Sequence, residues 1–311
     1  ETTPYEKAAH KNLGLLLAQL ERDVGARTEL EAAAAIPPDD PETKMALAQV
    51  YGRLGEKTKA QELLQGLTGS ASGDAGQDIY AAALRNDIDP GQTETDAQKV
   101  LYDIGDQFDS GELDRLGPSA FSSMRLVALA WARMGWAKFQ RGENLAALQF
   151  LTSAWQLSQS GTVANRLGQV LEKQGQKEKA RHMYALAVAA GGSDVADSRA
   201  RLAKLAGDPA AAAKDVAQAP AELVQARTVK LNPITGKTAS ARFNLVFDSS
   251  PRPERAEFVD GDESLRSASA QLREKDFPVR FPDVSSVKIV RRGEVRCGAS
   301  ECSIELLPIE K

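Results

Sequence analysis

The feature that most constrains the fold is a helix-turn-helix pattern that occurs twice in succession between residues 131 and 187. The first copy consists of Trp131, Met134, Gly135, Gly142, Ala147, Leu151 and Ala154. The second copy consists of Leu167, Gly168, Leu171, Gly175, Ala180, Tyr184 and Ala187. Gly135 and Gly168 are 33 residues apart. Small residues where two helices cross, with large residues between them, predict stacked helical hairpins of this period.

Two earlier segments carry the same pattern. The first comprises Leu13, Gly14, Leu17, Ala26, Leu30 and Ala33, and ends at Pro37-Pro38 because proline cannot continue a helix. The next comprises Leu47, Ala48, Tyr51, Gly55, Ala60 and Leu64. Residues 1–206 are therefore predicted to form a helical solenoid.

The period is lost between residues 68 and 123. Residues 68–76 have the composition of a flexible connector. A helix is predicted over 78–86, and residues 95–108 have the spacing of a first helix without a matching second one. We expect a degenerate repeat here and an irregular solenoid.

The repeats give way to a different pattern towards the C-terminus. Residues 194–205 predict a capping helix, and the Ala- and Pro-rich stretch 207–224 predicts a linker. From 225 onward the period changes from about 3.6 to 2 residues. Strands are predicted over 241–248, over 254–259, around Val287, Ile289 and Val295, and around Ile304 and Leu306, with a helix over 263–275. Residues 225–311 therefore predict a small α+β domain with an antiparallel sheet.

The repeated part resembles the tetratricopeptide repeat (TPR) family over about residues 7–205. The resemblance implies a mainly α protein, with a right-handed superhelix whose concave face holds peptides or partner proteins. Leu15 stands where family members that clamp a C-terminal carboxylate carry Asn, so the chain departs from that subset. Transferred position by position, the resemblance assigns the groove to Leu129, Ala132, Trp136, Phe139, Gln140, Asn165, Gln169, Glu172 and Lys173.

Trp136 and Phe139 are the sharpest binding candidates, because a large aromatic side chain in a groove can anchor a partner. The alternative is that the irregular segment before Ser123 covers them and makes them part of the core.

The last 70 or so residues are similar to the C-terminal domain of TonB-type energy transducers. The similarity rests on the strand pair within 241–259, on Gly261-Asp262 before a helix and on Phe277-Pro278. It implies a cell-envelope setting and an exposed sheet edge that could pair with an extended peptide. The transducer's membrane anchor and long proline-rich spacer are missing from these residues, so energy transduction is not implied.

Cys297 and Cys302 flank a four-residue loop in a predicted hairpin. Counting outward from the loop pairs 297 with 302 and 295 with 304, which brings the two sulfurs to one face within disulfide range. A disulfide, two buried free thiols and a redox or metal role all remain open.

Lys288, Arg292 and Arg296 line one face of a predicted strand, with Glu294 among them. A solvated sheet face explains them, and a patch for an anionic ligand is the alternative.

No residue spacing in the sequence suggests catalysis, a cofactor or a metal. The net charge of -4 argues against a nucleic-acid partner, and no apolar run reaches the roughly 18 residues of a membrane span. We therefore expect a non-enzymatic scaffold, periplasmic or otherwise extracytoplasmic, that binds a protein or peptide, does not span a membrane and could associate with one through its partner.

Because the first residue is Glu1, either a signal peptide has been removed or the chain is part of a longer one. The alternatives are the partner-binding C-terminal part of an envelope enzyme, such as a transglutaminase-like or peptidase protein, and an accessory subunit of a stable complex.

Overall fold

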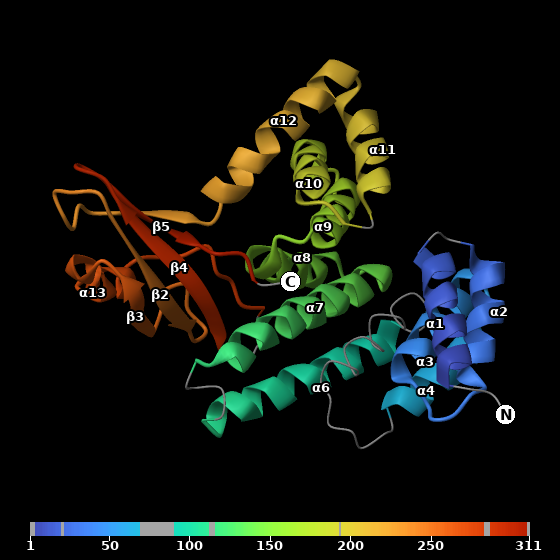
Figure 1. Cartoon of the computed structure of the whole chain (residues 1–311). Coiled ribbons are helices and arrows are strands. Elements are labelled where there is room, and N and C mark those ends of the chain that lie inside the picture. Colours follow the sequence, from blue (N-terminus) through green and yellow to red (C-terminus); the bar gives the residue numbers. More distant parts are fainter. Residues whose placement is uncertain are drawn as a thin grey trace. The chain divides into compact units, whose positions relative to one another are not determined.

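The computed structural model describes residues 4–19, 22–68, 90–111, 116–192, 194–282 and 287–309 (Figure 1). The helix predicted over 78–86 lies outside these residues. The chain divides into two compact units, Glu1–Val100 and Leu101–Lys311, and each is described by itself.

The first unit contains two helical hairpins, as the repeat pattern predicts. Their helices are α1 (Pro4–Gln19), α2 (Asp23–Ala34), α3 (Pro41–Arg53) and α4 (Lys57–Thr68). A Cβ atom at Gly14 would lie 2.7 Å from Cγ of Leu30, so only glycine lets α1 and α2 approach this closely. Leu30 joins Leu47, Val50 and Tyr51 in one buried core.

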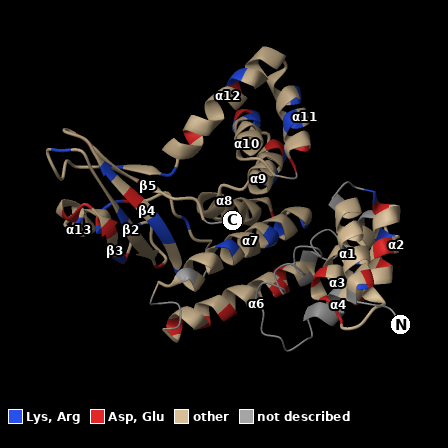
Figure 2. Cartoon of the chain, in the orientation of Figure 1, with Lys and Arg blue, Asp and Glu red and all other residues tan. Residues whose placement is uncertain are grey.

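A longer helix, α6 (Pro90–Asp109), begins in the first unit and continues into the second. It contains the helix predicted over 95–108. Acidic residues are frequent along α6, whereas the charged residues of the following helix are all basic, as Figure 2 shows.

The second unit contains the strong pair of predicted hairpins. Their helices are α7 (Pro118–Gln140), α8 (Asn144–Ser158), α9 (Gly161–Lys173) and α10 (Lys177–Ala190). Added Cβ atoms at Gly135 and Gly168 would lie 2.8 Å from Leu151 and 2.4 Å from Tyr184. The small residue of each first helix therefore meets the large residue of its own second helix, as the sequence pattern predicts.

The stretch predicted as a linker, 207–224, forms a helix in the structure. α11 (Val195–Ala206) is the predicted capping helix, and α12 (Pro209–Gln225) follows it directly. The side chain of Asp208 caps α12 by accepting from two backbone amides. Ala212 and Val216 pack on the core formed by α9, α10 and α11. This packing stabilises a helix here, although the alanine- and proline-rich composition suggested a linker.

The repeat spacing could have revealed α12. Gly207 adopts the positive φ of 67° that the hairpin glycine Gly175 also adopts, at 76°. Ala212, Val216 and Ala219 then follow Gly207 at the same intervals at which Ala180, Tyr184 and Ala187 follow Gly175. α11 and α12 thus continue the helical-hairpin pattern.

The C-terminal part is a five-stranded antiparallel sheet, so the predicted fold class is confirmed. Its strands are β1 (Thr228–Leu231), β2 (Ala239–Phe247), β3 (Arg255–Gly261), β4 (Ile289–Cys297) and β5 (Cys302–Leu306). The spatial order is β1-β5-β4-β2-β3. β1 was not predicted, because four residues are too short to show a strand period. The predicted register of the last hairpin is correct: Val295 pairs with Ile304 and Cys297 with Cys302.

The helix predicted over 263–275 is shorter and broken in the structure. It consists of a 3-10 turn, η1 (Glu263–Leu265), and α13 (Ala268–Arg273), which pack on β2 and β3. Leu265 and Leu272 are fully buried there, and the rings of Phe247 and Phe277 meet edge to face with centroids 5.5 Å apart.

Arg291 joins the sheet to the helical hairpins. Its guanidinium donates to the backbone carbonyls of Gln156 and Leu157 at the end of α8, at 3.3 and 3.1 Å, and to that of Leu307 at 2.8 Å. Burial, with a smaller effect of the Arg227 charge, lowers the pKa of Arg291 to about 10. Arg291 therefore stays protonated at neutral pH, facing the negative end of the α8 dipole.

Candidate protein-binding face

The groove residues predicted from the TPR resemblance lie on α7 and α9, and the structure places them at different depths. On α7, Ala132 is buried and Gln140 is exposed, while Leu129, Trp136 and Phe139 are half-buried. On α9, Asn165 is buried, Gln169 and Glu172 are half-buried, and Lys173 is exposed. We name this set of nine the first-helix face.

Trp136 and Phe139 form one aromatic pair, as their spacing of three residues on a helix allows. The ring centroids are 5.0 Å apart with the planes tilted by 35°. The guanidinium of Arg166, on α9, lies 4.9 Å from the Trp136 ring centroid, within the range of a cation–π interaction. The repeat pattern does not assign Arg166 to a groove. Only the packing of α9 beside α7 reveals it.

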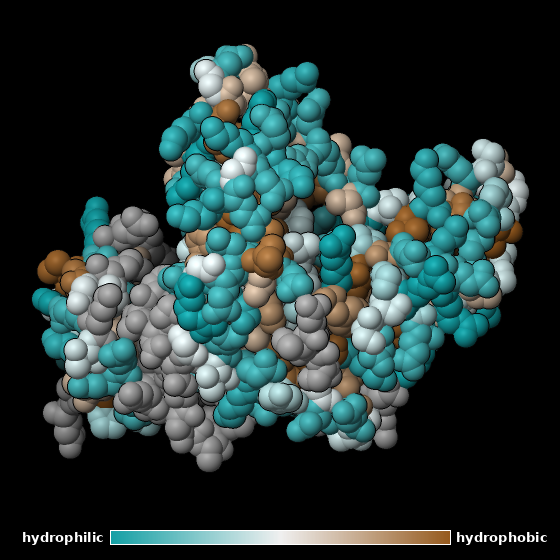
Figure 3. Space-filling model, turned by 180° about the vertical axis from the view of Figure 1, so that it is seen from behind, coloured by the Kyte–Doolittle hydropathy of each residue, from teal (hydrophilic) through white to brown (hydrophobic). Residues whose placement is uncertain are grey.

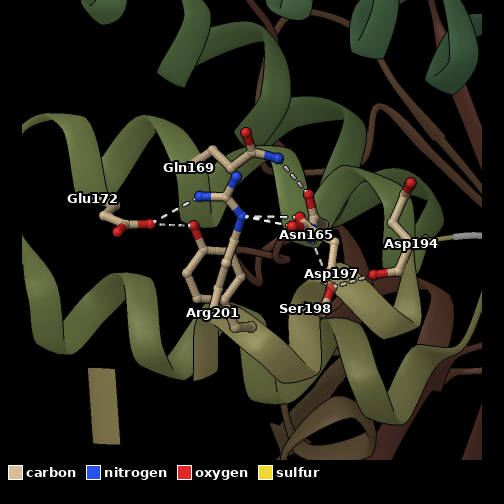
Figure 4. Close-up of polar contacts among 8 residues, drawn as sticks. Asn165, Gln169, Glu172, Asp194, Asp197, Ser198 and Arg201 are labelled. Carbon is tan, nitrogen blue, oxygen red and sulfur yellow. Dashed lines mark hydrogen bonds and ion pairs between the residues drawn. The ribbon is translucent and has the colours of Figure 1, made fainter. Parts of the chain in front are cut away.

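Asn165 has a structural role that its groove assignment did not suggest. Its amide nitrogen donates to Asp197 at 2.9 Å and to Ser198 at 2.8 Å, and its oxygen accepts from Gln169 at 2.6 Å (Figure 4). The side chain is only 2% exposed, so these bonds satisfy a buried amide. Asn165 therefore ties α9 to α11.

Glu172 belongs to a second group of polar contacts on the same side of α9. Its carboxylate accepts from the Tyr184 hydroxyl at 2.8 Å and from Arg201 at 3.2 Å. Arg201 also donates to Asp197, which links this group to the Asn165 contacts, as Figure 4 shows. Burial, together with the neighbouring Glu172 carboxylate, raises the pKa of Tyr184. The hydroxyl therefore remains a proton donor at neutral pH.

These contacts leave the first-helix face with an aromatic half and a polar half. The α7 half contains Trp136 and Phe139, with the Arg166 guanidinium against the Trp136 ring. In the α9 half, Asn165 and Glu172 are hydrogen-bonded to side chains of α10 and α11. A rigid aromatic pair beside a cation is suited to binding an apolar side chain next to an acidic one.

Each residue of the predicted cationic strand face has a partner in the structure. Arg296 contacts Glu294 at 2.7 Å and Glu305 at 3.4 Å. Lys288 lies 3.6 Å from Glu254, and the Arg292 guanidinium lies 4.2 Å from the Phe121 ring centroid. This arrangement favours a solvated, ion-paired sheet face over an anion-binding patch.

A cavity of about 590 Å³ opens beside this sheet face. Leu116, just before α7, and Phe121, within α7, line it on one side, and Arg242, Val259 and Arg292 line it from the sheet. The guanidinium of Arg242 forms an ion pair with the carboxylate of Asp260.

Cys297 and Cys302 face each other on β4 and β5. Their Cα atoms are 4.1 Å apart and their sulfurs lie at disulfide distance, 2.00 Å. Of the three possibilities left open by the sequence, the structure favours the disulfide. Within the described ranges, no three His, Cys, Asp or Glu residues are grouped so that they could hold a metal ion. Nor does any helix in those ranges have the length and apolar character needed to cross a membrane.

The fold therefore belongs to the class of helical-hairpin repeat proteins, here followed by an antiparallel sheet. Solved structures similar to this chain include TPR proteins. One is TTC0263, a thermophilic TPR protein of Thermus thermophilus, with 22% identity, coverage of 64% of this chain and 98% of that one, and a TM-score of 0.48. Another is PilF of Pseudomonas aeruginosa, with 22% identity, coverage of 69% and 90%, and a TM-score of 0.41.

A third similar structure, BtubC from P. vanneervenii, has 16% identity, coverage of 75% of this chain and 96% of that one, and a TM-score of 0.40. No family model and no curated protein matches the chain.

Proposed function

We propose that this chain is a non-enzymatic scaffold for protein–protein interaction that binds its partner on the first-helix face. The observation that carries the proposal is the aromatic pair of Trp136 and Phe139 with Arg166 packed against it. Aromatic side chains and arginine are the residue types that most often dominate the binding energy of protein interfaces.

Sheet-edge pairing, which the similarity to TonB-type domains suggests, has less support. The two edge strands are β1 and β3. β1 has only four residues, and β3 carries a register shift opposite Arg242 and Phe243 together with three charged residues. Short strands, bulges and charges are the means by which natural sheets prevent edge pairing. The first-helix face is therefore the stronger candidate.

An extracytoplasmic setting, such as the periplasm, is part of the proposal. It is supported by the cysteine pair at disulfide distance, because disulfides form and persist in oxidising compartments and are rare in the cytosol.

Site-specific photo-crosslinking tests the proposed face. A photoreactive amino acid is introduced at Gln140 or at Lys173, which are exposed on α7 and α9. The matched control is Leu145, which is 79% exposed on α8, a second helix. After irradiation in the native envelope fraction, we expect the same partner at Gln140 and Lys173 and none at Leu145.

The double substitution Trp136→Ala and Phe139→Ala should abolish this crosslink while leaving the thermal melting temperature nearly unchanged. A crosslink of equal strength at Leu145 would contradict the proposed face. A large fall in melting temperature would instead show that the two rings belong to the core.

A further inference from the structure

The cavity of about 590 Å³ between α7 and the sheet has the size of a small-molecule site, for which about 300 to 1,000 Å³ is usual. Most of the described residues that line it are apolar. Phe121 comes from α7, Val259 from β3, and Leu307 and Ile309 from the segment after β5. Figure 3 shows a mainly hydrophilic face of the molecule with small, separate hydrophobic patches. The lining of the cavity differs from such a surface and suits the apolar body of a ligand.

A buried cation in this lining has carbonyl groups, not carboxylates, as its described partners. Arg291 lines the cavity and is only 3% exposed. It donates to the backbone carbonyls of Gln156, Leu157 and Leu307, and its Nε has no hydrogen-bond partner in the described part of the chain. After burial, the influence that lowers its pKa is the charge of Arg227, another cation. Carbonyl dipoles stabilise the Arg291 charge without neutralising it, whereas buried charges are usually paired with an opposite charge.

Two further arginines bring positive charge to the same lining. The guanidinium of Arg292 lies against the Phe121 ring, a contact that adds no negative charge. Arg242 forms an ion pair with Asp260, and both residues line the cavity. Among the described lining residues, three arginines against one aspartate give a formal net charge of +2. The cavity is therefore complementary to a ligand that is apolar and negatively charged.

We propose that this cavity binds a small amphiphilic anion, an apolar chain with one terminal carboxylate. The chain lies against Phe121 and Val259, and the carboxylate lies near Arg291 and Arg292. Guanidinium groups hold carboxylates by charge-assisted hydrogen bonds, and the attraction is stronger in a site of low dielectric than in water. None of the nine residues of the first-helix face is among the described residues that line the cavity, so this is a second binding site.

Both parts of such a ligand are needed. An uncharged apolar ligand would shield Arg291 further from water without supplying an opposite charge, which is costly for a buried cation. A small inorganic anion would leave the apolar side chains of Val259, Leu307 and Ile309 in contact with water. An amphiphilic carboxylate supplies the opposite charge and covers the apolar side chains at once.

Isothermal titration calorimetry of the full chain with decanoate tests the proposal. We expect saturable binding of one decanoate per chain, about tenfold or more tighter than the binding of decanol, which has the same chain without the charge. Octanoate, which is two methylene groups shorter, should bind roughly tenfold more weakly than decanoate. An absence of saturable decanoate binding, or equal binding of decanol, would overturn the proposal.

Two matched substitutions at Val259 test the location. Val259 lines the cavity and is 49% exposed, so a polar residue is compatible with folding there. Val259→Glu adds a carboxylate to the lining, and Val259→Gln has nearly the same shape without the charge. We expect Val259→Glu to bind decanoate about tenfold or more weakly than Val259→Gln does, with equal decanol affinities in the two variants. Equal decanoate affinities would place the ligand elsewhere and overturn the proposal.

Removing the buried cation tests where the carboxylate lies. Arg291→Met should reduce the preference for decanoate over decanol about tenfold. The control Arg296→Met, on the same strand but not among the described lining residues, should leave that preference unchanged. If Arg291→Met does not fold, as judged by circular dichroism, Arg292→Met gives the same test. A preference that stays unchanged in the folded variants would overturn the assignment of the carboxylate to these arginines.

Discussion

The Arg291 guanidinium on β4 donates to the backbone carbonyl of Leu157, at the end of α8, over 3.1 Å. The two residues are 134 positions apart in the chain. The same guanidinium also donates to the backbone carbonyl of Leu307. One buried cation therefore links a helical hairpin, a central strand and the C-terminal segment.

Removing this cation should destabilise the packing of the sheet against the helical hairpins. Arg291→Met keeps most of the apolar stem and leaves the carbonyls without their donor, so we expect the free energy of unfolding to fall by about 3 kcal/mol. Urea denaturation followed by circular dichroism measures the change. The control Arg296→Met removes an exposed, ion-paired arginine of the same strand and should change stability by less than about 1 kcal/mol. Equal effects of the two substitutions would show that Arg291 has no special role.

Gly168 should tolerate no larger residue while Tyr184 faces it. The added Cβ of Gly168→Ala would lie 2.4 Å from the Tyr184 ring, and overpacking of this kind destabilises by about 1 to 3 kcal/mol. Thermal denaturation measures the loss. Replacing Tyr184 by Leu in the same protein should recover part of it, because this removes the aromatic ring that the added Cβ meets. Losses that simply add in the double variant would contradict a direct steric contact.

Acid should weaken the start of η1. The Ser264 side chain and backbone amide both donate to Asp262, and Lys237 lies nearby, which together lower the pKa of Asp262 to about 2. Because the folded pKa lies below the usual 3.8, the carboxylate stabilises the fold above that value and ceases to do so as the pH falls towards 2. Melting temperatures recorded between these pH values should fall more steeply for the wild type than for Asp262→Asn. Parallel curves would contradict this assignment.

The cysteine pair should be oxidised in protein taken from an oxidising compartment. Thiol titration of the unfolded protein is expected to find no free thiol before reduction and two afterwards. Because Cys297 and Cys302 close only a small loop, reduction should lower stability by no more than about 2 kcal/mol. Cys297→Ser with Cys302→Ser should therefore still fold. Two free thiols in the untreated protein would rule out the disulfide and remove the support it lends to an extracytoplasmic setting.

The sequence alone determined the helical hairpins and the register of the last β-hairpin. Both are local: the spacing of Gly135, Ala147 and Leu151 specifies which sides of two adjacent helices meet, and a four-residue loop leaves few registers for Cys297 and Cys302. The repeat spacing after Gly207 was compatible with α12, but its alanine- and proline-rich composition was ambiguous, and only the tertiary structure showed Val216 packing on the neighbouring core. It also decided that Asn165 is a buried link between helices and that Arg291 joins distant segments. A periodic pattern shows which side of a helix is apolar, but burial and hydrogen bonding depend on partners that the chain brings together from far apart.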